Sequence, residues 1–247
     1  MDKPSGWMYP TFRRLGHSVL LAAAAMGMGA VLSGDASAST VEISQTVSGS
    51  VFGSGNDNWS RSGQITGVSG TVGAGPFRVQ ADGFGDILAF CVNTAETLSL
   101  PGDYTVNASL FGATVKDNLT RLIWTAWDQL GTGASDAANR NLGAAFQLAA
   151  WEIINETEST LNVSKDNGTF FVQSGFTTAA INQANAWLGA LGDAEDNRLR
   201  PVFFEAANPA NNQDLMSVVP IPVPAAAWLL ISAFGGMALL RRKTSAV

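Results

Sequence analysis

A segment near the middle of the chain, 142–154, is apolar around almost its whole helical circumference and must therefore be covered on all sides. Its apolar residues are Leu142, Ala144, Ala145, Phe146, Leu148, Ala149, Ala150, Trp151, Ile153 and Ile154. We expect a helix capped by Asn139 or Asn141 that runs to about Asn155. Burying such a helix requires at least a second layer of structure, so the segment predicts a layered domain.

Gln147, a polar residue, stands in the middle of this segment, with Trp151 one turn later on the same face. Burying a carboxamide without partners costs about 1 to 3 kcal/mol, so the side chain needs one. A hydrogen bond to a neighbouring loop or strand carbonyl is one interpretation. The other is covalent, because the chain has a single cysteine, Cys91. Attack of its thiol on the Gln147 carbonyl, with loss of ammonia, would give an internal thioester.

The remaining elements are predicted from their spacing. Alternating stretches between Gly and Asn turns predict short antiparallel strands at 41–43 and 77–80. The apolar run 87–92, which contains Cys91, reads as a central strand buried on both faces. Three- and four-residue spacing predicts helices over about 116–130 and 177–191, and short strands are expected around Phe170 and at 202–204. The predicted fold class is α+β, a β-sandwich or barrel of short antiparallel strands with a helical layer that carries Gln147.

Composition excludes several function classes. The stretch from Ser39 to Ser217 holds 18 acidic and 8 basic side chains, a formal net charge of −10, so no nucleic-acid partner is expected. The single histidine, His17, lies in the N-terminal apolar region. Ser-His-Asp catalysis, Cys-His catalysis and His-ligated zinc are therefore excluded for the rest of the chain. We predict no catalytic residues, no metal, no cofactor and no enzymatic turnover.

The first 38 residues are typical of a secretory signal peptide. Lys3, Arg13 and Arg14 precede an apolar run over 15–32 that closes on small residues. We expect cleavage after Ala38. An uncleaved membrane anchor is the alternative.

The last residues form an apolar run, 225–240, followed by a basic cluster of Arg241, Arg242 and Lys243. A helix of this length reaches about 24 Å at a rise of ~1.5 Å per residue, which is marginal for a hydrocarbon core of ~30 Å. The basic cluster places the C-terminus in the cytoplasm. A buried core helix is the alternative for so short a run.

Residues Ile221, Pro222, Val223, Pro224 and Ala225 resemble the Val-Pro-Leu-Pro-Ala variant of the PEP-CTERM sorting signals of Gram-negative bacteria. The apolar run and the basic end follow in the order of that signal. The resemblance implies an exosortase as processing partner, which cuts near the motif. It also implies a transient inner-membrane anchor and a final place at the cell surface or in the extracellular matrix. The expected organisation is a signal peptide (1–38), an ectodomain (39–207), a linker (208–218) and a sorting tail with a transmembrane helix (219–247).

A second resemblance concerns the ectodomain. The stretches 90–93 and 145–153 resemble the paired Cys and Gln-x-Ala-x-Trp elements of bacterial Cys-Gln thioester domains, which are surface adhesins. It implies that Cys91 is the thiol partner and Gln147 the acyl partner of a bond that couples to amines or hydroxyls on a surface or matrix partner. Ala150 departs from the family, which often has Ile there. Because water would compete for such a bond, the aromatic residues Phe90, Phe146 and Trp151 are candidate shields.

Two other functions stay open. In the first, the protein is a non-covalent surface or biofilm-matrix protein in which Cys91 is a small buried hydrophobe. In the second, it is a secreted hydrolase that uses carboxylates such as Asp86 and Glu152, since a paired-carboxylate glycosidase needs no histidine. No motif supports the hydrolase.

The tail generates the first prediction, that the mature surface protein lacks the segment from Ala225 onward. Replacing Pro222 and Pro224 with Ala should leave full-length protein in the inner membrane, because the processing motif is lost. Mass spectrometry of both termini checks this, and the N-terminus should begin at or near Ser39. Mature surface protein that still ends in the basic cluster 241–243 would contradict the sorting hypothesis.

Overall fold

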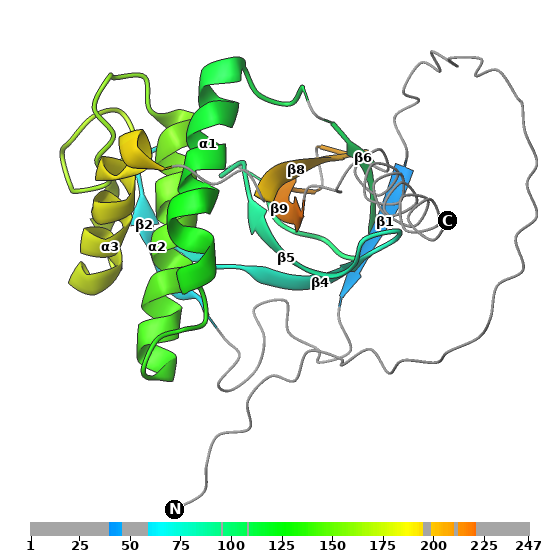
Figure 1. The fold of residues 1–247 in the computed structure, drawn as a ribbon, viewed down its shortest axis with the longest axis horizontal. Helices are drawn as coiled ribbons and strands as arrows, with labels where there is room; N and C mark the ends of the chain where they lie inside the picture. The colour runs from blue at the N-terminus through cyan, green and yellow to red at the C-terminus, as the bar shows by residue number, and fades with distance from the viewer. Residues whose placement is uncertain are drawn as a thin grey trace, which may run out of the picture. The chain divides into compact units, whose positions relative to one another are not determined.

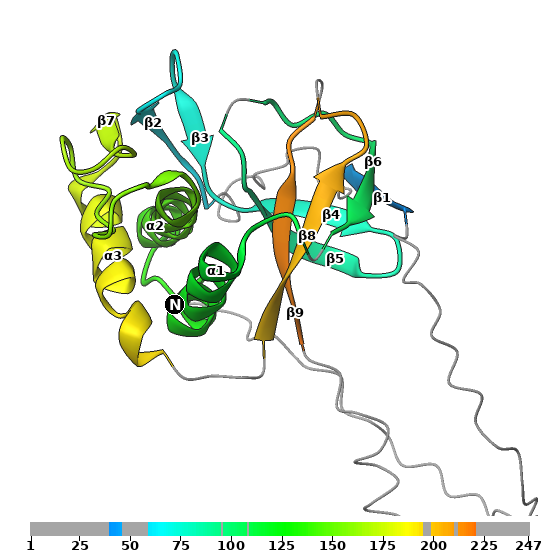
Figure 2. The same cartoon turned by 90° about the horizontal axis from the view of Figure 1, so that it is seen from above.

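A computed structural model of the chain describes residues 40–45, 59–94, 96–107, 109–194, 199–209 and 212–220. The predicted signal peptide and the sorting residues Pro222, Pro224, Ala225, Arg241, Arg242 and Lys243 lie outside them. Across the ranges described, no helix is both long and apolar enough to cross a membrane. These ranges form an α+β domain with a barrel on one side and helices on the other (Figures 1 and 2).

In the described chain, antiparallel strands close into a barrel in the order β1-β4-β5-β9-β8-β6. Their bounds are β1 Thr40–Gln45, β4 Phe77–Ala81, β5 Gly85–Cys91, β6 Gly102–Val106, β8 Leu199–Ala206 and β9 Leu215–Pro220. Pairing of β1 with β6, where Val41 lies opposite Tyr104, closes the ring. Alternation along β1 turns Val41 and Ile43 into the core. The predicted class, an α+β fold with a barrel of short antiparallel strands, is confirmed.

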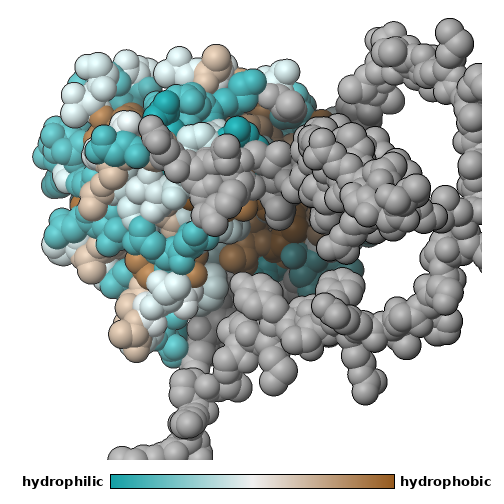
Figure 3. Space-filling model, in the orientation of Figure 1, coloured by the Kyte–Doolittle hydropathy of each residue, from teal (hydrophilic) through white to brown (hydrophobic). Residues whose placement is uncertain are grey.

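A helical layer and a second sheet complete the domain. The helices are α1 Ala113–Ala126, α2 Asp136–Asn155 and α3 Thr178–Gly189, and the second sheet has the order β3-β2-β7. Its strands are β2 Arg61–Ile65, β3 Val72–Ala74 and β7 Val172–Ser174. Figure 2 shows α2 between α1 and α3, with β2 and β3 beside it. In the view of Figure 3, hydrophilic residues predominate on the surface of the helical side.

The central helix α2 is buried without interruption from Gly143 to Ile153, as its apolar circumference predicts. Gly143 allows a close approach, since a Cβ there would lie 2.1 Å from the carbonyl oxygen of Trp59. The predicted cap is wrong, because Ser135 caps the helix by accepting from the N–H of Ala138 at 3.3 Å. Asn139 instead accepts from the N–H of Gly133, and Asn141 accepts from Arg61.

Two further boundaries differ from expectation. The helix predicted over about 116–130 begins at Ala113 and ends at Ala126, where a 3₁₀ turn, Trp127–Gln129, takes over. The strand expected around Phe170 begins two residues later, at Val172. Both differences are of the size expected at element ends, where local pattern is weakest.

Strand β9 lies partly in the segment 208–218 that the sequence predicts as a linker, and it extends into the predicted tail at 219–247. It pairs with β5, where Leu215 lies opposite Cys91, and with β8 along its whole length. Leu215 and Met216 are fully buried. The domain therefore continues past residue 207 to at least Pro220. The apolar residues of β9 are few and follow a polar, Asn-rich stretch. They form a strand because the barrel closes there between β5 and β8.

Strand β9 generates a prediction about truncation. A chain from Ser39 to Ala207 should fail to fold, because β5 and β8 would lose the strand between them and two buried side chains. A chain from Ser39 to Pro220 is the matched control and should fold. Near-ultraviolet circular dichroism and denaturant unfolding distinguish the two, and Leu215→Ala in the longer chain should cost about 2 to 5 kcal/mol. Equal cooperative unfolding of both chains would show that β9 is dispensable.

Candidate functional site

The carboxamide of Gln147 on α2 lies directly on the backbone of Cys91 at the end of β5. Its Oε1 accepts from the Cys91 N–H at 3.1 Å, and its Nε2 donates to the Cys91 carbonyl oxygen at 2.7 Å. The exposed fraction is 0% for Gln147 and 2% for Cys91. The structure thus brings together the two residues that the sequence proposes as partners, although they are 56 positions apart.

This carboxamide occupies the place of a strand partner. Strand β4 pairs with β5 only as far as Ala89, which lies opposite Phe77. The N–H and C=O of Cys91 would therefore be left unpaired at that edge of β5. A primary carboxamide has a donor and an acceptor, as a peptide group does, so Gln147 satisfies both. Gln147 therefore has the hydrogen-bond partners that the first interpretation requires. These partners belong to Cys91, the same residue that the covalent interpretation requires.

The thiol of Cys91 is held in a buried and weakly acidic state. Burial raises its pKa to about 12; the Trp151 indole and the Asn93 backbone lower it, and the negative charges of Glu96 and Asp214 raise it. The thiol donates to the Asn93 carbonyl oxygen. The Trp151 indole N–H is buried and has no acceptor at ordinary hydrogen-bond geometry. At neutral pH the thiol is therefore protonated rather than a free thiolate.

A pocket of about 460 Å³ has Cys91 in its wall. Trp151, Phe77 and Leu98 supply apolar parts of the lining, and Glu96 supplies a carboxylate. Gln147 does not line the pocket. A molecule that enters it would therefore meet Cys91 while the carboxamide stays covered.

The three candidate shields lie in two different places. Trp151 lines the pocket beside Cys91. Phe90 and Phe146 are fully buried and pack on each other with ring centroids 4.4 Å apart. Trp127 completes this aromatic cluster at 6.1 Å from Phe90 and 5.8 Å from Phe146. Trp127 falls within the helix predicted over about 116–130, and the spacing of that segment alone does not indicate that its ring contacts Phe90 and Phe146.

The carboxylates of the hydrolase alternative do not form a site. Asp86 is exposed near the start of β5. Glu152 is fully buried, where one carboxyl oxygen accepts from the Asn162 N–H and the other has no partner. Neither residue lines the pocket at Cys91. In the part of the chain that the structure describes, no group of three or more His, Cys, Asp or Glu side chains could hold a metal ion.

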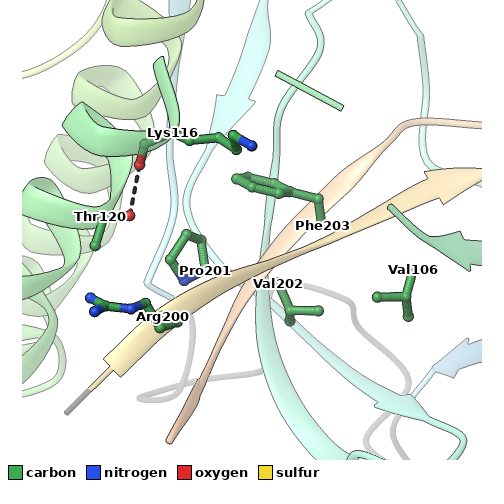
Figure 4. Close-up of a pocket in the computed structure, with 7 residues that line it drawn as sticks. All are labelled: Val106, Lys116, Thr120, Arg200, Pro201, Val202 and Phe203. Carbon is green, nitrogen blue, oxygen red and sulfur yellow. Dashed lines mark hydrogen bonds between the residues drawn. The ribbon is translucent and has the colours of Figure 1, made fainter. Parts of the chain in front are cut away.

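A second pocket, of about 260 Å³, lies between α1 and β8 (Figure 4). Lys116 and Thr120 line it from the helix, and Arg200 and Phe203 line it from the strand. The Thr120 hydroxyl donates to the Lys116 carbonyl oxygen at 2.7 Å, and the Arg200 guanidinium lies 5.2 Å from the Trp124 ring centroid. This pocket shares no lining residue with the one at Cys91 and has no thiol or carboxylate in its wall.

Solved structures that match part of this chain include N-terminal thioester domains. The N-terminal thioester domain of a protein F2 like fibronectin-binding protein from Streptococcus pneumoniae is 12% identical, with a TM-score of 0.45 over 74% of this chain and 94% of that one. The N-terminal thioester domain of a Clostridium perfringens surface protein is 12% identical, with a TM-score of 0.43 over 74% and 100%. The N-terminal domain of the Streptococcus pyogenes pilus tip adhesin Cpa is 13% identical, with a TM-score of 0.40 over 60% and 85%.

No protein-family model and no curated protein sequence matches this chain. The structural neighbours share too few identical residues with this chain to indicate the chemistry of its site.

The buried carboxyl of Glu152 predicts that the free energy of unfolding depends on pH. Burial raises the pKa of its carboxyl from 4.5 to about 7; the Asn162 N–H lowers it, and the Glu156 charge raises it. Between these two values the folded protein binds more protons than the unfolded chain, so stability falls as pH rises from about 4.5 to about 7. Glu152→Gln keeps an acceptor for Asn162 and removes the titration. Between pH 5 and 8, the free energy of unfolding of the wild type should fall by roughly 2 to 3 kcal/mol relative to this variant. Denaturant titrations measure it, and parallel pH profiles would refute it.

Proposed function

We propose that Cys91 and Gln147 form an internal thioester, and that the exported protein uses it once to attach itself covalently to a surface or matrix partner. The observation that carries this proposal is the pairing of the Gln147 carboxamide with the Cys91 backbone at 3.1 and 2.7 Å. It brings an acyl group to the only cysteine of the chain.

In the bond-forming step, the Cys91 sulfur attacks Cδ of Gln147 and negative charge develops on Oε1. The Cys91 N–H, 3.1 Å from that oxygen, is positioned to stabilise the charge. The Cδ–Nε2 bond then breaks, and the thiol proton leaves with the amino group as ammonia. The reaction balances without an oxidant, a metal or a cofactor.

In the coupling step, an amine or hydroxyl of the partner attacks Cδ and the bond to sulfur breaks. A proton from the nucleophile returns to the Cys91 sulfur, and Gln147 is left joined to the partner by an amide or ester. The pocket of about 460 Å³ leads a nucleophile to Cys91, and in the thioester Cδ of Gln147 is bonded directly to the sulfur of that residue. The burial that raises the thiol pKa also makes sulfur a slower leaving group, which protects the bond against water. Since the thiol is not regenerated as a thioester, this is a single use and not enzymatic turnover.

Export and sorting belong to the same proposal. The signal peptide directs the chain out of the cytoplasm, the C-terminal apolar run 225–240 holds it in the inner membrane, and an exosortase releases the ectodomain to the surface or matrix. The two lysines of the ectodomain are Lys116 and Lys165, and neither lines the pocket at Cys91. Coupling is therefore directed to amines of other molecules.

A second candidate function is a non-covalent surface or matrix protein with a buried free cysteine. Two observations favour it, the raised pKa of the Cys91 thiol and the hydrogen bonds that both Oε1 and Nε2 of Gln147 make with the Cys91 backbone. In that case Gln147 serves only to extend the β5 ladder beyond β4. The folded ectodomain is lighter by one molecule of ammonia under the first candidate than under the second.

The mass of the folded ectodomain distinguishes the candidates. A thioester predicts one ammonia less than the sequence mass and no thiol that labels after denaturation in mild acid. Methylamine should then restore a labelable Cys91 and place a methylamide on Gln147. The full sequence mass with one free thiol, in protein purified without amine buffers, would favour the second candidate.

Variants supply the controls for this measurement. Cys91→Ala and Gln147→Ala should each abolish the mass deficit. Both should also lower stability, because a crosslink across 56 residues contributes about 4 kcal/mol in the chain-entropy model. Cys91→Ser can at best form an ester and should react far more weakly with amines, while keeping the backbone contacts of Gln147.

A further inference from the structure

We propose that Glu96 draws a protonated amine into the pocket beside Cys91 and accepts the proton that the amine must lose before it attacks. This inference rests on the proposed thioester and adds to it a proton acceptor and a preference for amines over hydroxyls.

Two features of Glu96 support this role, its position in the pocket at Cys91 and a buried carboxylate oxygen without a partner. Glu96 lies between β5 and β6, five residues after Cys91, and lines the same pocket of about 460 Å³. Its Oε2 is buried and has no hydrogen-bond partner. Its backbone carbonyl oxygen accepts from the side chain of Gln213, which ties this part of the chain to the segment before β9. A buried carboxylate oxygen without a partner is costly, and an incoming ammonium group would satisfy it.

Charge in the pocket favours a cation. Of the described residues that line this pocket, Glu96 is the only charged one. No lysine or arginine in the lining competes for the carboxylate. A protonated alkylamine would therefore be attracted, whereas a hydroxyl group gains nothing from the charge.

Other ionisable groups near the thiol are less suited to accept a proton. Asp214, which acts on the thiol electrostatically, accepts from the Ala206 N–H at 2.8 Å and does not line the pocket. Burial raises the pKa of the Tyr104 hydroxyl, so this group stays neutral. The Trp151 indole can only donate. Glu205, whose charge acts on Asp214, accepts from the Asn107 side chain at 2.8 Å.

The proton transfers balance. An alkylamine such as lysine, with a pKa of about 10.4, is protonated at neutral pH and has no free electron pair. In the pocket the ammonium group gives one proton to the Glu96 carboxylate, which leaves both groups neutral. The neutral nitrogen attacks Cδ of Gln147, the bond to sulfur breaks, and a second proton from the nitrogen goes to the Cys91 thiolate. Glu96 then releases its proton to water.

By microscopic reversibility, the same carboxylate also acts when the thioester forms. Ammonia is the simplest amine, and its departure reverses the attack of an amine. Glu96 is therefore placed to supply the proton that turns the leaving ammonia into ammonium. Loss of the carboxylate should slow both formation of the bond and its reaction with amines.

The test compares Glu96→Gln with the wild-type ectodomain, with Glu42→Gln as the control for loss of one acidic charge, since Glu42 is exposed on β1. Two nucleophiles are used, methylamine, which is cationic at pH 7, and hydroxylamine, which is neutral there. Glu96→Gln should react with methylamine at least about 10-fold more slowly at pH 7, in line with the size of proton-transfer effects. With hydroxylamine the rate should change by less than about 3-fold. The methylamine deficit should shrink as pH rises toward the pKa of the amine.

The outcomes separate this inference from the proposed function. A wild-type ectodomain with full sequence mass and a free thiol refutes the thioester itself. A thioester in the wild type, with equal methylamine rates in Glu96→Gln, overturns only the role of Glu96. Equal slowing with both nucleophiles at every pH also overturns it, because that pattern indicates a structural defect. If Glu96→Gln forms no thioester, Glu96→Asp decides: slow formation with the wild-type shape of pH profile supports the proposal, and complete failure overturns it.

Discussion

The site depends on one physical constraint, the need to satisfy a buried carboxamide and a buried strand end together. Helix α2 is buried on every side, so Gln147 has no access to water. Strand β4 stops short of Cys91, so the backbone groups of that residue also lack a partner. Each deficit alone would cost about 1 to 3 kcal/mol per group, and pairing removes both. The fold therefore holds the acyl carbon close to the cysteine for reasons of stability alone.

In the proposed thioester chemistry, this site activates the electrophile rather than the nucleophile. Reactive cysteines generally have a lowered pKa, from a helix N-terminus or a neighbouring cation. Here burial raises the pKa of the Cys91 thiol, and the Cys91 N–H polarises the carbonyl that the sulfur would attack. Slow chemistry is acceptable for the proposed bond, because it would form once in each molecule. The burial that slows its formation would also exclude water afterwards.

Local pattern predicts the central helix, the fold class and the proximity of Gln147 to Cys91. An apolar circumference predicts burial in any fold, and a polar residue in the middle of it, such as Gln147, predicts a specific partner. Pattern was insufficient where closure of the barrel decides the structure. Leu215 and Met216 follow an Asn-rich stretch and become a strand only because β5 and β8 each lack a neighbour. Ser135 was missed as a cap because the apolar periodicity begins well after it.

The pocket at Cys91 is still harder to predict from local sequence pattern, because its walls come from segments that are distant in sequence. Phe77 comes from β4, Leu98 follows Cys91, and Trp151 comes from α2. Glu96 reads in the sequence as an ordinary loop charge, and only the fold leaves one of its oxygens buried and unpartnered. Trp151 separates from the other two candidate shields for a related reason. Its one-turn spacing from Gln147 puts it on the pocket face of α2, whereas Phe146 turns toward Phe90 and Trp127. Trp151 is therefore the candidate shield that lines the pocket beside Cys91, whereas Phe90 and Phe146 pack strand β5 against helix α2.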